Sequence, residues 1–185
     1  MLRLLTLLVL AATFVGCGAK TVEEPPTTID LAELVRILPT PPGLDQSSSV
    51  STVDAAGLQR QFAGVARAES ATVFEQIGFR GGAVRTWSGP SGAAMAVAVS
   101  RWPDHQTATN VGGGAVQRVV DTSGAAAWTP QDLAGTRGAR LVQEPEVRML
   151  SIAIADVSLV VRADGPIGDD AVIRTMDLLT RPVRA

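Results

Sequence analysis

The sequence predicts an α+β domain in which a four- or five-stranded, mainly antiparallel sheet has helices packed on one face. Two observations support this class. Apolar residues recur at helical spacing before residue 78 and again after residue 168, whereas strand-like runs cover 83–102 and 148–163. Each strand-like run is divided by a short turn, which favours antiparallel pairing because a parallel pair needs a long crossover. Helices placed around such hairpins are typical of α+β domains.

Five segments have the apolar spacing or the boundary residues of helices. They cover 29–38, 53–65, 68–77, 103–120 and a C-terminal segment that starts at Gly168 or Asp169. Pro39 ends the first helix, and Gly78 ends the third as the glycine that follows the last turn. The fourth contains Gly112, Gly113 and Gly114 in its middle, where glycine is costly, so we expect that helix to break there.

The strands are expected in two hairpins and one isolated segment. They cover 83–87, 93–102, 139–142, 148–155 and 157–163, with polar or irregular loops at 46–51 and 125–133. The last two strands give the strongest signal, and Asp156 forms the tight turn between them. Their alternation predicts Ile152 and Ile154 in the core, with Ser151 and Ser158 on the solvent side.

Composition and charge exclude several classes of function. The chain has 185 residues, with 16 Lys and Arg against 18 Asp and Glu, so a nucleic-acid partner is not expected. Lys20 is the only lysine, which excludes Walker-A and Schiff-base lysine chemistry beyond it. A single histidine and a single cysteine cannot form a His/Cys metal site or a disulfide framework. We therefore predict no metal and no cofactor.

The N-terminus has the features of a secretory signal. Arg3 supplies a positive charge, and 4–15 is an uncharged, mostly apolar run. Its twelve residues are too few for a membrane-spanning helix, which needs about 20, but they fit the apolar region of a signal peptide. Gly16 and Cys17, the only cysteine, follow directly. The alternative interpretation is a short apolar helix with a buried thiol.

The residues Phe14-Val15-Gly16-Cys17 resemble the lipobox of bacterial lipoproteins, although the first position of that motif is usually leucine. The resemblance implies cleavage before Cys17 and acylation of its sulfur. Residues 1–16 would then be a lipoprotein signal peptide, 17–28 a lipidated tether and 29–185 a single α+β domain. The protein is expected on the extracytoplasmic face of the cell membrane, where two acyl chains hold a protein that one chain would not.

The layout of the remaining chain is similar to that of small secreted lipoproteins of high-GC, actinobacterial-like bacteria. The residues that carry this resemblance are the Leu-Pro-Thr-Pro-Pro-Gly turn at 38–43, the Gly78-Phe79 helix end, the strand ending in Arg101-Trp102 and the late hairpin before the last helix. Many such domains have a Mog1/PsbP-like α+β fold. The resemblance implies that fold and supplies no catalytic residues.

A search for catalytic groups predicts none. His105 is the only imidazole, and it is expected to be an exposed residue at a helix start. Ser91 lies in the turn 89–92, which lacks the Gly-x-Ser-x-Gly pattern of a nucleophile elbow. The adjacent carboxylates of Asp169 and Asp170 suit a helix N-terminus better than an acid–base pair.

Trp87, Trp102 and Trp128 are the candidate contact residues for a ligand or partner, because tryptophan is enriched at binding hot spots. The alternative for each is a place in the core, and Trp87 and Trp102 could pair across a hairpin. The leading hypothesis is a non-enzymatic, lipid-anchored module that binds an unknown envelope partner. The second is a carrier of a small apolar or lipid ligand, held in a cavity between helices and sheet. The third is a hydrolase.

Overall fold

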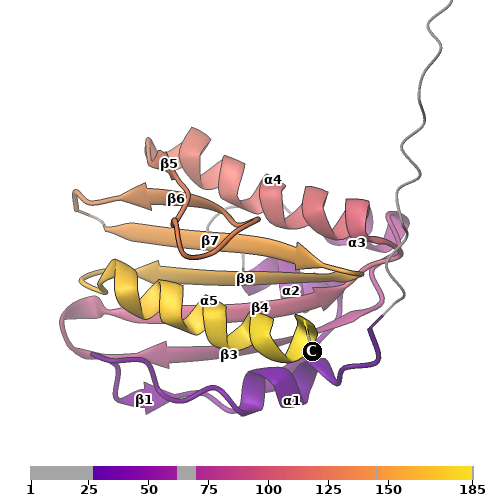
Figure 1. Ribbon diagram of the computed structural model, residues 1–185, viewed down its shortest axis with the longest axis horizontal. Coiled ribbons are helices and arrows are strands. Elements are labelled where there is room, and N and C mark those ends of the chain that lie inside the picture. The colour runs from indigo at the N-terminus through magenta and orange to yellow at the C-terminus, as the bar shows by residue number, and fades with distance from the viewer. Residues whose placement is uncertain (1–26, 62–69, 145, 185) are drawn as a thin grey trace, which may run out of the picture.

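The strands of this chain pair antiparallel throughout (Figure 1). The computed structural model describes residues 27–61, 70–144 and 146–184. Within these ranges eight strands form one sheet in the order β1-β3-β4-β8-β7-β6-β5, with β2 also paired to β3. The α+β class is confirmed, but the prediction of four or five strands is wrong. Short strands without apolar alternation extend both edges, and two of these lie in the expected loops 46–51 and 125–133.

The two hairpins form the centre of the sheet, and shorter strands flank them. The strands are β1 (Gln46–Ser47), β2 (Ser51–Val53), β3 (Gly81–Ser88), β4 (Ala94–Arg101), β5 (Ala126–Trp128), β6 (Arg137–Leu141), β7 (Val147–Ile154) and β8 (Val157–Asp164). The helices are α1 (Leu31–Arg36), α2 (Ala55–Gln61), α3 (Ser70–Gln76), α4 (His105–Ser123) and α5 (Asp169–Arg184), with a 3-10 turn at Pro90–Gly92. Each expected helix and hairpin therefore corresponds to an observed element, with shifted boundaries.

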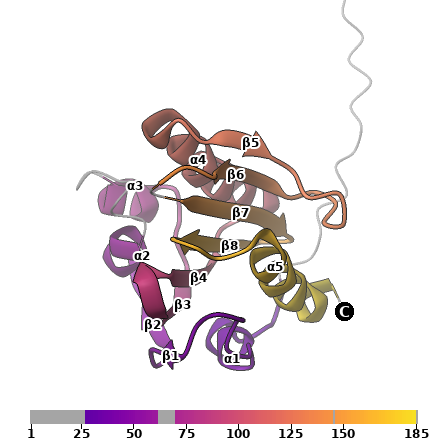
Figure 2. The ribbon, with the colours of Figure 1, turned by 90° about the vertical axis from the view of Figure 1, so that its left-hand side faces the viewer.

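Helices cover both faces of the sheet, which corrects the prediction of one covered face (Figure 2). α1 and α5 pack on one face, and α2 and α4 contribute to the core on the other. The central strands are apolar on both sides: Val97 and Ala98 of β4 face opposite cores, as do Leu150 and Met149 of β7. Strands that are apolar on both faces need cover on both faces to remove that surface from water.

The late hairpin confirms the strongest strand prediction. β7 and β8 are joined through the turn at Ala155 and Asp156, and they pair in register along their whole length. Ile152 is buried as expected, and Ile154 is half-buried. Ser151 and Ser158 are also buried, at 4% and 1% exposure, and not on a solvent side. The reason is that α4 covers the face on which they lie.

The helix α4 runs unbroken through its three glycines, so the predicted break is wrong. Asp104 caps it by accepting a hydrogen bond from the Thr107 amide at 2.7 Å, and Gly124 ends it in the left-handed conformation. Gly112 faces the sheet, where a Cβ would lie 2.1 Å from Ser151 Oγ and 2.7 Å from Ser158 Oγ. The close approach of α4 to β7 and β8 therefore requires glycine at position 112. The packing gained by this approach offsets the low helix propensity of glycine.

This contact predicts opposite effects for two neighbouring substitutions. Gly112→Ala should lower the free energy of unfolding by about 1–2 kcal/mol, because overpacking against both serines exceeds the gain in helix propensity. Gly114→Ala meets no atom within 4 Å and should raise that free energy by about 0.5–1 kcal/mol. Urea unfolding of both variants measures the contrast. Equal effects of the two substitutions would contradict the close approach at Gly112.

The N-terminal end of the described chain is held at the β7–β8 turn. The Thr27 amide donates a hydrogen bond to Asp156 Oδ1 at 3.0 Å. Arg101 Nη2 donates to the Ile29 carbonyl at 2.8 Å, and Arg101 Nε lies 3.4 Å from Asp156 Oδ2. The Asp156 side chain is 4% exposed. This junction fixes the point at which the preceding residues meet the domain.

Several sequence-based expectations fall outside the described residues. These are the signal peptide 1–16, Cys17, most of the tether 17–28, and residues 62–69, which span the adjoining ends of two expected helices. Among the helices that are described, none combines the length and the apolar character needed to cross a membrane.

Candidate binding site at one end of the sheet

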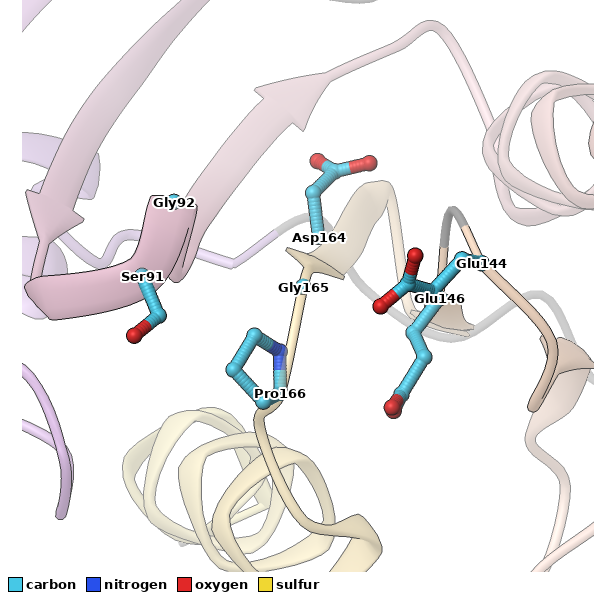
Figure 3. Close-up of a pocket in the computed structure, with 7 residues that line it drawn as sticks. All are labelled: Ser91, Gly92, Glu144, Glu146, Asp164, Gly165 and Pro166. Carbon is cyan, nitrogen blue, oxygen red and sulfur yellow. The ribbon is translucent and has the colours of Figure 1, made fainter.

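A pocket of about 680 Å³ opens where three connections meet at one end of the sheet (Figure 3). They are the β3–β4 turn, the β6–β7 loop and the start of the β8–α5 loop. The lining residues are Ser91, Gly92, Glu144, Glu146, Asp164, Gly165 and Pro166. Because Asp156 precedes β8 and Asp164 ends it, the pocket lies at the opposite end of the strands from Thr27.

Tight backbone contacts bring the β3–β4 turn against the end of β8. Gly165 has φ +80°, and a Cβ there would lie 3.0 Å from the Gly92 carbonyl oxygen. Gly92 has φ +75°, and Ser91 has φ 55° within the 3-10 turn. Glycine is favoured at positions 165 and 92 because its backbone adopts the left-handed region without a Cβ penalty. The Gly-Pro-Ser-Gly turn predicted from sequence thus forms one wall of the pocket.

Carboxylates line much of the pocket: Glu144 and Glu146 lie across it from Ser91, and Asp164 lies between them at the end of β8 (Figure 3). Asp164 accepts hydrogen bonds from Arg162, including one of 2.8 Å from Nη2. Glu146 accepts from Arg148 Nη1 at 2.8 Å. Glu144 is exposed. The pocket therefore presents carboxylate and hydroxyl oxygens, with two of its three acids already neutralised by arginine.

A buried arginine connects the pocket wall to the start of α5. Arg148 on β7 is 9% exposed in its side chain, and its Nε donates to Asp169 Oδ1 at 2.6 Å. Arg140 on β6 donates from Nη1 to Asp169 Oδ2 at 2.5 Å. Asp169 therefore bridges two strands to the first turn of α5. Its negative charge also suits the helix N-terminus, as the sequence suggested.

These contacts move the pKa values of both charged partners. Burial is the largest influence on Asp169 and acts to raise its pKa, but hydrogen bonds from Arg148 and Arg140 together outweigh it and hold the pKa below the usual value. Burial likewise acts to lower the pKa of Arg148. The hydrogen bonds to Asp169 and Glu146 exceed that effect, so the pKa of Arg148 is raised. Both shifts stabilise the charged forms that pair.

The three tryptophans occupy different places. Trp87 is 2% exposed and belongs to the core under α1 and α5, whereas Trp102 is 0% exposed in the core on the other face. The two rings therefore lie on opposite sides of the sheet, and the cross-strand pair considered above does not form. Trp128 is half-buried, with the Arg140 guanidinium 5.7 Å from its ring centroid. It retains an accessible surface beside the Asp169 network.

The residues considered for catalysis are spread across the domain. His105 is exposed at the first position of α4, and its Nδ1 lies 3.1 Å from the Ala155 carbonyl oxygen, at the Asp156 end of the sheet. Ser91 lies in the pocket at the other end. Among residues 27–61, 70–144 and 146–184, no three His, Cys, Asp or Glu side chains form a group that could hold a metal ion.

Sequence reasoning did not find the pocket. Glu144 and Glu146 come from the β6–β7 loop and Asp164 from the end of β8; the fold brings them together, and no sequence pattern relates their positions. The sequence predicts Arg148 on a strand and Asp169 at a helix start, but their pairing depends on the packing of α5 against β7. The turn residues at 89–92 and the Gly-Pro at 165–166 are local signals, and they predict chain reversals and not a site.

Comparison with known proteins identifies a similar fold. No protein-family model matches the chain, and no curated protein matches its sequence. The extracellular domain of PknH from Mycobacterium tuberculosis has a similar structure, with a TM-score of 0.51 and 13% sequence identity. The match covers 75% of this chain and 84% of that domain. At this identity the similarity shows a shared α+β fold, and the Mog1/PsbP-like resemblance stays a prediction.

Proposed function

We propose that the protein is a lipid-anchored, extracytoplasmic binding module without catalytic activity, and that the pocket at the end of the sheet is its contact surface. The observation that carries this proposal is the position of the pocket. It lies at the end of β8 remote from Thr27, and eight residues of extended strand measure about 26 Å. A partner can therefore reach the pocket without approaching the attachment point.

Two observations support the extracytoplasmic location. The only cysteine follows a short apolar run and ends a lipobox-like sequence, which favours acylation at Cys17. The structurally similar domain of PknH is described as extracellular. If the domain lies on the outer side of the membrane, the residues between Cys17 and Thr27 would connect it to a lipid anchor at Cys17.

The chemistry of the pocket favours partner binding over the two alternatives. A carrier of an apolar ligand would need a cavity lined by Leu, Val and Phe, whereas this pocket is lined by glycine, proline, serine and carboxylates. A hydrolase would need a general base beside a nucleophile, but His105 and Ser91 lie at opposite ends of the sheet. The pocket oxygens suit a partner that contributes amide or cationic donors.

The anchor is tested at Cys17. Cys17→Ser removes the thiol that would be acylated, so the variant should either leave the membrane fraction or retain its uncleaved signal. Cell fractionation with mass spectrometry of the N-terminal peptide measures both outcomes. Processing and membrane attachment like those of the parent chain would contradict the lipid anchor. A Ser49→Ala variant serves as a control that leaves Cys17 unchanged.

The contact surface is tested by position-specific photo-crosslinking in intact cells. A photoreactive residue at Ser91, inside the pocket, should yield one discrete crosslinked product. The same residue at Gln117, exposed on α4 and away from the pocket, should not yield it. Adding Glu144→Arg should reduce the Ser91 product, because it reverses the exposed charge of the pocket. The same product from both positions, or none from Ser91, would contradict the proposed surface.

A further inference from the structure

A second pocket, of about 490 Å³, lies beside α1 and has a different chemistry. Its lining residues are Ala32, Arg36, Ser48, Ser49, Val50, Thr52 and Arg85. None of them is acidic, two are arginines and three carry hydroxyl groups. We call this the arginine–hydroxyl pocket. It lies on the α1 side of the sheet, whereas the pocket described above lies at the strand ends.

Arg85 is fixed in place on one side of its guanidinium. Its Nε donates to Ser47 Oγ at 2.9 Å, and its Nη1 donates to the carbonyls of Leu38 at 2.8 Å and Arg36 at 3.1 Å. The guanidinium carbon lies 4.8 Å from the ring centroid of the buried Trp87. Arg85 thereby caps the C-terminal carbonyls of α1, and its orientation is set before any ligand arrives.

The other side of the same guanidinium is unused. Among the described residues, no acceptor bonds Arg85 Nη2 and no carboxylate forms an ion pair with Arg85. The second arginine of the pocket, Arg36, pairs with Glu33 on α1. Arg85 therefore contributes a half-buried positive charge that carbonyl dipoles satisfy only in part. A full negative charge is the partner that such a group lacks.

Hydroxyl groups provide further donors around that charge. Ser48 Oγ accepts a hydrogen bond from the Thr86 amide at 3.0 Å, which leaves its own proton available to a ligand. Ser49, on the connection between β1 and β2, and Thr52, on β2, are both exposed. Guanidinium with several hydroxyl donors matches the oxygens of a phosphate group, which accept many hydrogen bonds and carry negative charge.

We propose that the arginine–hydroxyl pocket binds a phosphate group, with Arg85 Nη2 as its principal charged donor. The pocket is larger than inorganic phosphate, so the group would belong to a larger molecule or to a lipid headgroup. Arg85 lies midway along β3, opposite Val97 of β4, so the pocket is beside the strands and away from both of their ends. The proposal does not depend on the lipid anchor or on the pocket at the strand ends.

The experiment uses the full chain in detergent, with NMR titration of the Arg85 Nε and of the amides of 48–52. Inorganic phosphate should give saturable shifts confined to this pocket, and glycerol 3-phosphate tests the headgroup source. Tighter binding of glycerol 3-phosphate would support a headgroup, and equal binding would support a soluble phosphate compound. Shifts that do not saturate, or that spread evenly over the exposed arginines, would overturn the proposal.

Three variants test whether phosphate binds in the arginine–hydroxyl pocket. Arg85→Gln should weaken phosphate binding by about tenfold or more, since a charge-assisted donor is lost. Thr52→Glu should weaken it similarly while leaving the Arg85 contacts to α1 intact, so it serves if Arg85→Gln folds poorly. Arg60→Gln removes one charge from the exposed side of α2 and should change binding by less than about twofold. Unchanged binding in Thr52→Glu, or an equal loss in Arg60→Gln, would overturn the proposal.

Discussion

Trp102→Ala is expected to lower the free energy of unfolding by about 3–5 kcal/mol, the largest effect of any single substitution considered for this chain. Trp102 is fully buried directly after β4. Phe74 and Phe79 meet its ring edge-on, with centroids 5.5 Å and 5.4 Å away, and its Nε1 donates to Ser100 Oγ at 2.9 Å. Truncation leaves a cavity between the sheet and the α2–α3 side and removes the partner of a buried hydroxyl.

Urea unfolding followed by circular dichroism measures this loss. Trp102→Phe provides a matched control, because it keeps much of the ring volume and loses the hydrogen bond, so its loss should be clearly smaller. Trp128→Ala, at a half-buried ring, should also cost much less. A loss below about 1 kcal/mol for Trp102→Ala would contradict its role as a core residue.

Arg148→Ala is expected to lower the free energy of unfolding by about 2–3 kcal/mol. Removal of one partner of a buried ion pair costs about 3–5 kcal/mol when the remaining charge stays buried. Asp169 and Glu146 are 30% and 28% exposed in their side chains, so water can rehydrate them and the loss is smaller. Arg162→Ala is the matched control, because that arginine pairs with a more exposed carboxylate at the surface. Equal losses for the two variants would contradict a special role for the Asp169 network.

The same network predicts a pH dependence of stability. The pKa of Asp169 is lower in the folded chain than in the unfolded chain, so its stabilisation is fully present above the unfolded value of about 3.9. It is lost as the pH falls through the folded pKa. Asp169→Asn should therefore be less stable than the parent chain at neutral pH, and the difference should shrink towards acid pH. A difference that stays constant across this range would exclude ionisation of Asp169 as its cause.

The regular part of the fold follows from local patterns. The late hairpin around Asp156, the glycine-rich turn after β3 and the helix from Asp169 depend on alternation, turn residues and capping, which neighbouring residues determine. The prediction of a break at Gly112 is wrong because the local sequence is the same in two cases. A glycine can interrupt a helix, or it can allow the helix to pack closely against a strand. Only the contact with Ser151 and Ser158 distinguishes the two cases.

The candidate sites could not be predicted because they depend on tertiary contacts. β1, β2 and β5 have two or three residues each and are mostly exposed, so no apolar alternation marks them. Yet the β1–β2 connection and β2 itself supply the hydroxyls beside Arg85. Likewise, Glu146 and Asp164 reach the same pocket only because β7 and β8 pair with their ends aligned.

The junction at Asp156 sets the largest distance that a lipid-anchored domain could reach from the bilayer. Thr27 is ten residues after Cys17, so the chain from Cys17 to Thr27 extends at most about 36 Å, and the pocket at the strand ends lies about 26 Å further on. A lipid anchor at Cys17 would therefore confine that pocket to a shell within about 60 Å of the bilayer. A partner held in the same membrane would be met at a high effective concentration, so a contact that is weak in free solution would still be occupied.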